Sequence, residues 1–237
     1  MSMSGITTFF GGLYDGDCGL GSEEGPRRDQ SRINRISIME RFSFAARQLV
    51  TPIPGTCPDI HILDTVPKSD TQRPAAECIL TRMDNVVLGV LTSDCLPVLL
   101  ADKKEGITGT IHLSREMLLQ GFTQRVVEAM EDMNASHIEA WLGPCLQSQH
   151  HYLSGPAEDW IRQNPAVASH MIPDGAEKCK LDYTAFAVAE LQRLGVHIRS
   201  ASDEDTYSGL YFSLRRRQID GNAGANLSFI SLNHGPS

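Results

Sequence analysis

The sequence predicts a single α/β domain over residues 1–237, with a mixed β-sheet and flanking helices. Short apolar runs alternate with stretches of helical periodicity, which is the pattern of an α/β protein. Only Lys103–Gly106 separates two of these runs, a gap short enough for a hairpin and therefore for an antiparallel pair. A chain of 237 residues with 41% hydrophobic content can bury one sizeable core.

The first 35 residues are rich in Gly and Asp and predict loop with short extended pieces. A helix is expected from about Asp29 or Ser31 to Gln48. Strands are expected after it, several of them as continuous apolar runs that suit burial on both faces. The predicted strands are Ile60–Leu63, Val86–Leu91, Leu96–Leu100, Ile107–Leu113, Ile138–Leu142 and Val196–Ala201.

Two further helices are predicted from their start and stop signals. Ser114 can cap a helix over Glu116–Met133, whose apolar residues repeat at helical spacing. Asp182 can cap a second helix that begins at Tyr183 and stops at Gly195.

Composition excludes several classes of partner. The net charge of −8 argues against a nucleic-acid polymer, because affinity for phosphate backbones needs clustered Lys and Arg. No apolar run approaches the ~20 residues that cross a bilayer, and the N-terminus does not resemble a signal peptide, so no membrane association is expected. The six cysteines have no C-x-x-C spacing, which favours a reducing, cytoplasmic compartment.

The predicted hairpin brings two reactive residues together. It places Cys95, before the first strand, beside His112, near the end of the second. A cysteine and a histidine at one strand end suit either a metal site or a nucleophile with its base. The plainer interpretation is a buried thiol and a structural histidine.

Four stretches in order resemble the motifs of the multicopper polyphenol oxidase (laccase-like) family. They are TSDCLPVLLAD at 92–102, Ile111-His112, WLGPC at 141–145 and DTYSGLYFSLRRR at 205–217. Members of that family are described as purine nucleoside phosphorylases with accompanying adenosine deaminase activity. The resemblance implies a fold similar to the catalytic domain of the cytotoxic necrotizing factor toxins, which use a Cys-His pair. It also implies a zinc ion, with Cys95 and His112 as two of three ligands.

The third zinc ligand of the family is missing from its expected position. Where the family has a histidine in a Q-V-H-G motif, this chain has Pro54, which carries no donor atom. Cys57 and His61 lie close by in sequence and could replace it. Two ligands alone hold zinc weakly, because structural sites use four and catalytic sites usually three with a water.

Other family positions also differ. Glu116 and Ala225 stand where the family has arginines, Asp205 stands where it has the cysteine of C-T-Y, and Glu77 stands where it has an aspartate. The loss of two arginines predicts weak phosphorolysis, since Glu116 would repel phosphate.

Arg215 and Arg216 match the family's paired arginines and are predicted to bind substrate, because guanidinium groups grip phosphate or carboxylate. A solvated charge run is the alternative for them. The adjacent His150 and His151 are expected in a surface loop, since neighbouring residues point in different directions.

Three functions remain open at this point. The first is a weakened enzyme that uses zinc on Cys95 and His112 for phosphorolysis or deamination of purine nucleosides, with the nucleoside and phosphate as partners. The second is an inactive paralogue that binds a ligand. The third is a metal-free amide hydrolase with Cys95 as nucleophile and His112 as base.

Overall fold

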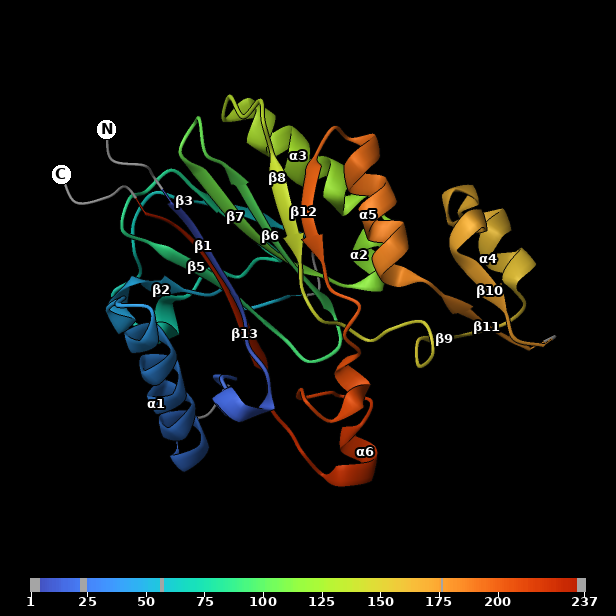
Figure 1. Ribbon diagram of the computed structural model, residues 1–237, viewed down its shortest axis with the longest axis horizontal. Coiled ribbons are helices and arrows are strands. Elements are labelled where there is room, and N and C mark those ends of the chain that lie inside the picture. Colours follow the sequence, from blue (N-terminus) through green and yellow to red (C-terminus); the bar gives the residue numbers. More distant parts are fainter. Residues whose placement is uncertain (1–4, 22–24, 56–57, 176, 234–237) are drawn as a thin grey trace.

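The computed structural model describes residues 5–21, 25–55, 58–175 and 177–233 (Figure 1). Its largest sheet has the order β12-β8-β6-β7-β4-β3, with parallel pairs at the edges and antiparallel pairs between them. The strands of this sheet are β3 (Ile60–Leu63), β4 (Cys78–Thr81), β6 (Leu96–Asp102), β7 (Ile107–Leu113), β8 (Glu139–Leu142) and β12 (His197–Ala201). The predicted mixed α/β class is confirmed, and β4 adds a strand that the sequence does not predict.

The predicted hairpin is formed by β6 and β7. Their register runs from Asp102 opposite Ile107 at the turn to Leu96 opposite Leu113 at the far end. Gly106 closes the turn with a φ of 68°, a left-handed conformation that glycine adopts without strain. Pairing along the whole length of both strands fixes which residues meet at the open end of the hairpin.

A second sheet covers one face of the first and has the order β1-β13-β5-β2. These strands are β1 (Gly5–Phe10), β2 (Leu49–Val50), β5 (Val87–Thr92) and β13 (Asn226–Asn233). The N-terminal stretch, predicted as loop with short extended pieces, contains one such piece, β1, which pairs with β13. Helix α1 (Pro26–Arg41) packs on this sheet through Ile38 and Met39, which are buried against Phe229 (Figure 1).

Helices cover the other face of the largest sheet (Figure 1). They are α2 (Arg115–Leu119), α3 (Phe122–Asp132) and α5 (Tyr183–Arg193). Every residue of β6 is buried because the strand lies between two layers. Val98 clusters with the helix residue Val126, whereas the next residue, Leu99, clusters with Ile230 of the second sheet.

The observed helix boundaries confirm the predicted N-terminal caps but not every predicted start and end. Ser114 and Asp182 accept hydrogen bonds from the third residue after each, so both predicted caps are confirmed. The single helix predicted over Glu116–Met133 is wrong, because Gly121, with a φ of 72°, separates α2 from α3. The predicted start of α1 is also too late, since the helix begins at Pro26, and it ends at Arg41.

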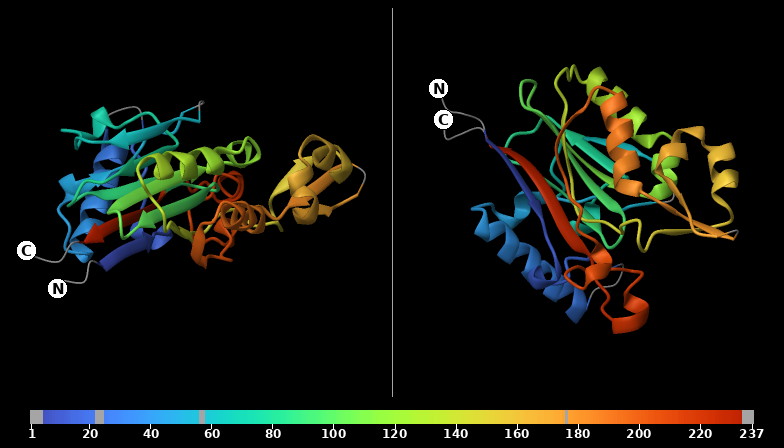
Figure 2. Two further views of the ribbon diagram at one scale, coloured as in Figure 1. Left: turned by 90° about the horizontal axis from the view of Figure 1, so that it is seen from above. Right: turned by 45° about the vertical axis from the view of Figure 1, so that its right-hand side comes forward.

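A small three-stranded sheet with helix α4 (Ala157–Gln163) projects from one side of these layers (Figure 2). Its strands are β9 (Tyr152–Ser154), β10 (Met171–Pro173) and β11 (Lys178–Leu181). A short helix, α6 (Arg217–Asp220), follows β12 and precedes β13. No helix in the described part of the chain is long and apolar enough to cross a membrane.

Candidate active site

Cys95 and His112 meet at the open end of the β6–β7 hairpin. Cys95 directly precedes β6, and His112 lies opposite Pro97 in the register of the two strands. The imidazole of His112 is within hydrogen-bonding reach of the Cys95 thiol, and both residues are half-buried. The structure therefore confirms the juxtaposition that the hairpin predicts.

Glu77 completes this group of side chains from the neighbouring strand. It directly precedes β4, which pairs with β7, and its Oε2 lies 2.7 Å from Nδ1 of His112. The Glu77 side chain is only 3% exposed. Since Nδ1 is held by the carboxylate, the other ring nitrogen of His112 is left for Cys95. Carboxylate, imidazole and thiol are the three groups of a cysteine nucleophile with an oriented base.

The charge state of His112 is set by these two neighbours. Burial lowers the pKa of His112, but hydrogen bonds to Cys95 and Glu77 outweigh it and raise that pKa to about 10. An imidazole that is protonated at neutral pH favours an ionised thiol beside it, and the thiolate is the nucleophilic form of cysteine.

A cavity of about 510 Å³ opens beside Cys95. Residues from distant parts of the sequence line it, and those that matter for chemistry are Cys95, Arg115, Glu116, His151, Tyr183 and Arg215. A volume of this size is sufficient for a ligand as large as a nucleoside. The reactive thiol therefore faces a space that a small molecule can occupy.

Asp94 organises the walls of this cavity, which the sequence does not predict. Its Oδ1 accepts hydrogen bonds from the hydroxyls of Thr206 at 2.8 Å and Ser213 at 2.6 Å. Its Oδ2 accepts from the backbone amide of Arg215 at 2.8 Å. One carboxylate next to Cys95 thus fixes the segment that carries Arg215.

His151 is a second buried histidine in the cavity wall, and its placement corrects the expectation of a surface loop. It is 8% exposed, it packs edge-on against the ring of Tyr183, and its Nδ1 has no hydrogen-bond partner among the described residues. Burial lowers the pKa of His151 to about 4, and the charges of Arg115 and Arg215 act in the same direction. His151 is therefore a neutral imidazole at pH 7.

The two paired arginines separate in the structure. Arg215 lines the cavity, whereas Arg216 donates to the carbonyl of Tyr207 at 2.7 Å and to Asp220 at 2.8 Å and is not in the cavity lining. Arg115 also lines the cavity and pairs with Glu116. Arg115 therefore balances the negative charge of Glu116.

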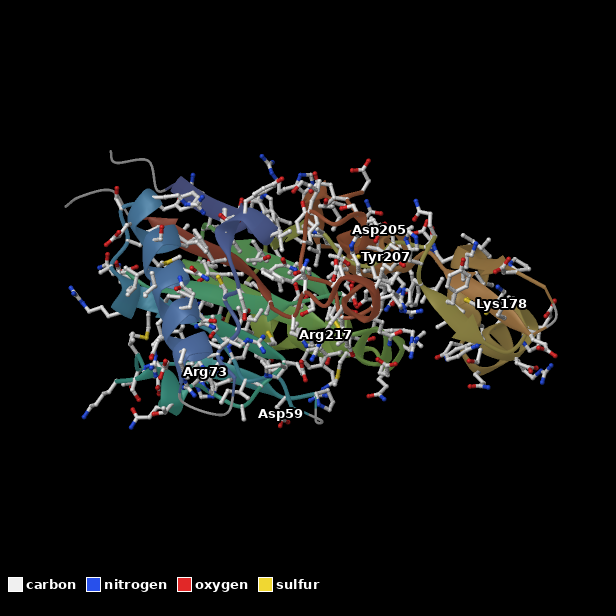
Figure 3. All side chains as sticks on the ribbon, turned by 90° about the horizontal axis from the view of Figure 1, so that it is seen from below. Asp59, Arg73, Lys178, Asp205, Tyr207 and Arg217 are labelled. Carbon is white, nitrogen blue, oxygen red and sulfur yellow. The ribbon has the colours of Figure 1, made fainter. Side chains whose placement is uncertain are left out.

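His150, the neighbour of His151 in sequence, contacts Asp205 and Tyr207. Figure 3 shows these two residues close to one another. His150 Nδ1 lies 2.6 Å from Asp205 Oδ2, and the His150 ring stacks on Tyr207 with centroids 4.0 Å apart. Asp205 also accepts from the amide of Tyr207 at 3.0 Å. At the position of the family cysteine, this chain therefore has an aspartate that anchors a loop.

Residues 8–233 match the family model described as multi-copper polyphenol oxidoreductase laccase. The chain belongs to this family. The purine nucleoside phosphorylase ORF3 of Streptomyces griseus is 34% identical over 69% of this chain and 67% of its own length. A purine nucleoside phosphorylase of Streptomyces coelicolor, SCO2081, is 32% identical over the same shares.

Two solved structures have the same fold as this chain. The hypothetical protein YfiH of Bacillus licheniformis superimposes with a TM-score of 0.82 at 20% identity, covering 96% of this chain and 93% of that one. YlmD of Geobacillus stearothermophilus gives a TM-score of 0.78 at 18% identity, covering 98% and 92%.

The described residues do not supply the donor set of a zinc centre in this member of the polyphenol oxidoreductase family. They contain no group of three His, Cys, Asp or Glu side chains arranged to hold a metal ion. Pro54 lies in a loop against the site, since the amide of the next residue, Gly55, donates to Glu77 at 3.0 Å. His61 lines a different cavity, and Cys57 lies outside the described residues.

Proposed function

We propose that this chain is an enzyme that acts on purine nucleosides in the cavity beside Cys95, and that deamination is the reaction its side chains support best. The observation that carries the proposal is the contact of Glu77 with His112 and of His112 with Cys95, the one of the three that lines the cavity. The names of the two Streptomyces relatives support the substrate class. The likeness to the toxin catalytic domains that use a Cys-His pair belongs to the same proposal.

The chemistry follows from the order of the three groups. His112 already holds the proton of Cys95 in the resting site, and the thiolate attacks the purine carbon that carries the amino group, forming a C–S bond. Protonated His112 then gives a proton to the amino group, which leaves as ammonia. Water attacks the same carbon while His112 accepts its proton, the C–S bond breaks, and the thiolate beside protonated His112 is restored. The balance is an aminopurine plus water giving an oxopurine plus ammonia.

Glu77 has a positioning role in this sequence. Its carboxylate holds Nδ1 of His112 at 2.7 Å, which keeps the other nitrogen directed at Cys95 and stabilises the imidazolium. Because the described residues do not supply a donor set for zinc, no step here passes through a metal ion.

Phosphorolysis is a second candidate, favoured by the two arginines of the cavity. Arg115 and Arg215 both line it, and guanidinium groups bind phosphate well. Arg115 offsets Glu116, so the loss of the family arginine at that position does not leave the cavity without positive charge. A cytoplasmic location belongs to the same proposal and is supported by the five described cysteines, which are all free.

The test is a set of parallel assays with adenosine and inosine, each with and without phosphate. The expected result is conversion of adenosine to inosine without phosphate, reduced at least about 10²-fold by Cys95→Ala and by His112→Ala. Cys179→Ala is the matched control, because this free buried cysteine lies in β11, away from the cavity.

Each other outcome selects a different function. Base release that needs phosphate and is lost in Arg215→Gln would favour phosphorolysis. No turnover of either nucleoside by folded protein would contradict the enzyme and leave the binding paralogue. Activity that survives Cys95→Ala would show that the thiol is not the nucleophile.

A further inference from the structure

A second cavity of about 310 Å³ lies on the other side of the molecule, between α1 and the loop at 67–73. Figure 3 shows Arg73 beside α1, well apart from Asp205 and Tyr207 near the candidate active site. Five positively charged residues line this cavity, namely Arg32, Arg35, Arg47, Lys68 and Arg73. The whole chain has a net charge of −8, so this local concentration of positive charge is unlike the rest of the protein.

Arg35 is the most deeply placed of these groups. The residue is 8% exposed, its Nε donates to the carbonyl of Cys18 at 2.8 Å, and its Nη1 donates to Thr51 Oγ1 at 3.3 Å. Its Nη2 is buried and has no hydrogen-bond partner among the residues that the structure describes. A buried charged donor without a hydrogen bond costs free energy. The unsatisfied N–H groups of Nη2 therefore point to a missing acceptor.

Arg73 approaches the same hydroxyl from the other side. Its Nη1 donates to Thr51 Oγ1 at 3.3 Å and to the carbonyl of Pro52 at 3.3 Å. Two guanidinium groups therefore converge on one neutral oxygen atom, and their positive charges repel one another. Burial, the larger cause, and the charge of Arg73 together lower the pKa of Arg35 to about 10.

The carboxylate in the lining does not neutralise this pair by direct contact. Asp70 bonds instead to Arg32 at 2.8 Å and to Arg28 at 3.2 Å. Within the described part of the chain, Arg35 and Arg73 donate hydrogen bonds only to uncharged oxygens, namely one hydroxyl and several backbone carbonyls. An external anion would supply the missing negative charge.

We infer that this cavity binds a phosphate group, either free or at the end of a small molecule. Phosphate presents several oxygens at once and suits two converging guanidinium forks better than a single carboxylate does. Arg47 and Lys68 are exposed at the rim, where their charges attract the anion from solvent. Apolar side chains of Leu20 and Ile36 in the lining offer a surface for the rest of an esterified ligand. This site is independent of the proposed function at Cys95.

Calorimetric titration at constant ionic strength in chloride tests the inference with three probes, namely inorganic phosphate, adenosine 5′-monophosphate and adenosine. Phosphate or its monoester should bind, and Arg73→Gln should weaken that binding about tenfold, the loss expected for one charge-assisted contact. The double variant Arg47→Gln with Lys68→Gln should weaken it about threefold or more. If phosphate and the monoester bind equally, the free ion is the ligand; tighter monoester binding identifies the ester.

Two control variants locate the site. Arg215→Gln removes a charge from the cavity beside Cys95, and Arg162→Gln removes one from the exposed surface of α4. Neither should change, by more than about twofold, the phosphate affinity that Arg73→Gln weakens. Binding that is lost in Arg215→Gln but kept in Arg73→Gln and in the rim pair would overturn the inference, as would no binding of either phosphate probe. The rim variants decide the matter if Arg73→Gln does not fold, because both rim side chains are exposed.

Discussion

Glu77 holds His112 through its backbone and its side chain. Oε2 of Glu77 lies 2.7 Å from Nδ1 of His112, and the backbone amide of His112 donates to the Glu77 carbonyl at 2.8 Å. The other carboxylate oxygen accepts from the amide of Gly55 at 3.0 Å. Glu77 therefore ties the loop at 52–55 to the strand that carries the imidazole, and it restricts rotation of that ring.

Glu77→Gln should reduce the rate more than it reduces binding. The amide preserves the shape of the side chain but removes the charge that stabilises protonated His112, so kcat should fall about 10²-fold or more with little change in KM. The alkaline limb of the pH–rate profile should also move to lower pH, because the pKa of His112 falls without the carboxylate. An unchanged pH profile would show that Glu77 acts only through packing.

The stability that His112 contributes to the folded protein should be lost at alkaline pH. Its folded pKa is about 10, against an ordinary value of 6.5, so its contribution is fully present below pH 6.5 and is lost as pH rises through 10. Urea unfolding between about pH 6.5 and 8.5 should show falling stability in the wild type and a flatter curve in His112→Asn. This pH window lies below 9.0, the ordinary pKa of a cysteine thiol. The buried cysteines therefore contribute little to the change of stability with pH.

His151→Phe should separate stability from function. Phenylalanine keeps a ring against Tyr183 and removes a buried nitrogen without a partner, so the melting temperature should be unchanged or higher. Because the pKa of His151 is about 4 in the folded protein, the wild type loses stability as pH falls from 6.5 to 4, and the variant should lose less. A raised KM for nucleosides would show that the imidazole contacts substrate.

Asp94→Asn should loosen the wall of the cavity. The carboxylate accepts from Thr206, Ser213 and the amide of Arg215, and each hydrogen bond to a charged group contributes about 1.5–3 kcal/mol. A net loss of about 2 kcal/mol corresponds to a fall in melting temperature of about 4–8 °C for a chain of this size. Calorimetry measures this, with Asp159→Asn on the exposed surface of α4 as the matched control.

Purified protein should contain much less than one equivalent of zinc. Pro54→His should increase the zinc content without restoring a full equivalent, because a new ligand also needs neighbouring groups to orient it. Elemental analysis of protein prepared without chelators or a histidine tag measures both. A full equivalent of tightly held zinc in the unmodified chain would contradict this prediction and direct attention to Cys57.

The parts of the site that depend on neighbouring sequence could be predicted. The turn at Lys103–Gly106 is short, so it fixes the register of β6 and β7 and brings Cys95 to His112. The bonds of Asp94 to Thr206 and Ser213 could not be predicted, because they join residues more than 100 positions apart and leave no periodic pattern. The break at Gly121 between α2 and α3 could not be predicted either. An isolated glycine in an amphipathic stretch does not by itself show that the helix stops.

The position of β13 between β1 and β5 has a consequence for the order in which the chain folds on the ribosome (Figure 1). The hairpin of β6 and β7 needs only local sequence and can pair as soon as it is synthesised. The strands β1 and β5 must wait for β13, which is made more than 130 residues after Thr92 at the end of β5. Until then both strands present open hydrogen-bonding edges, which makes the nascent chain a ready client for a chaperone.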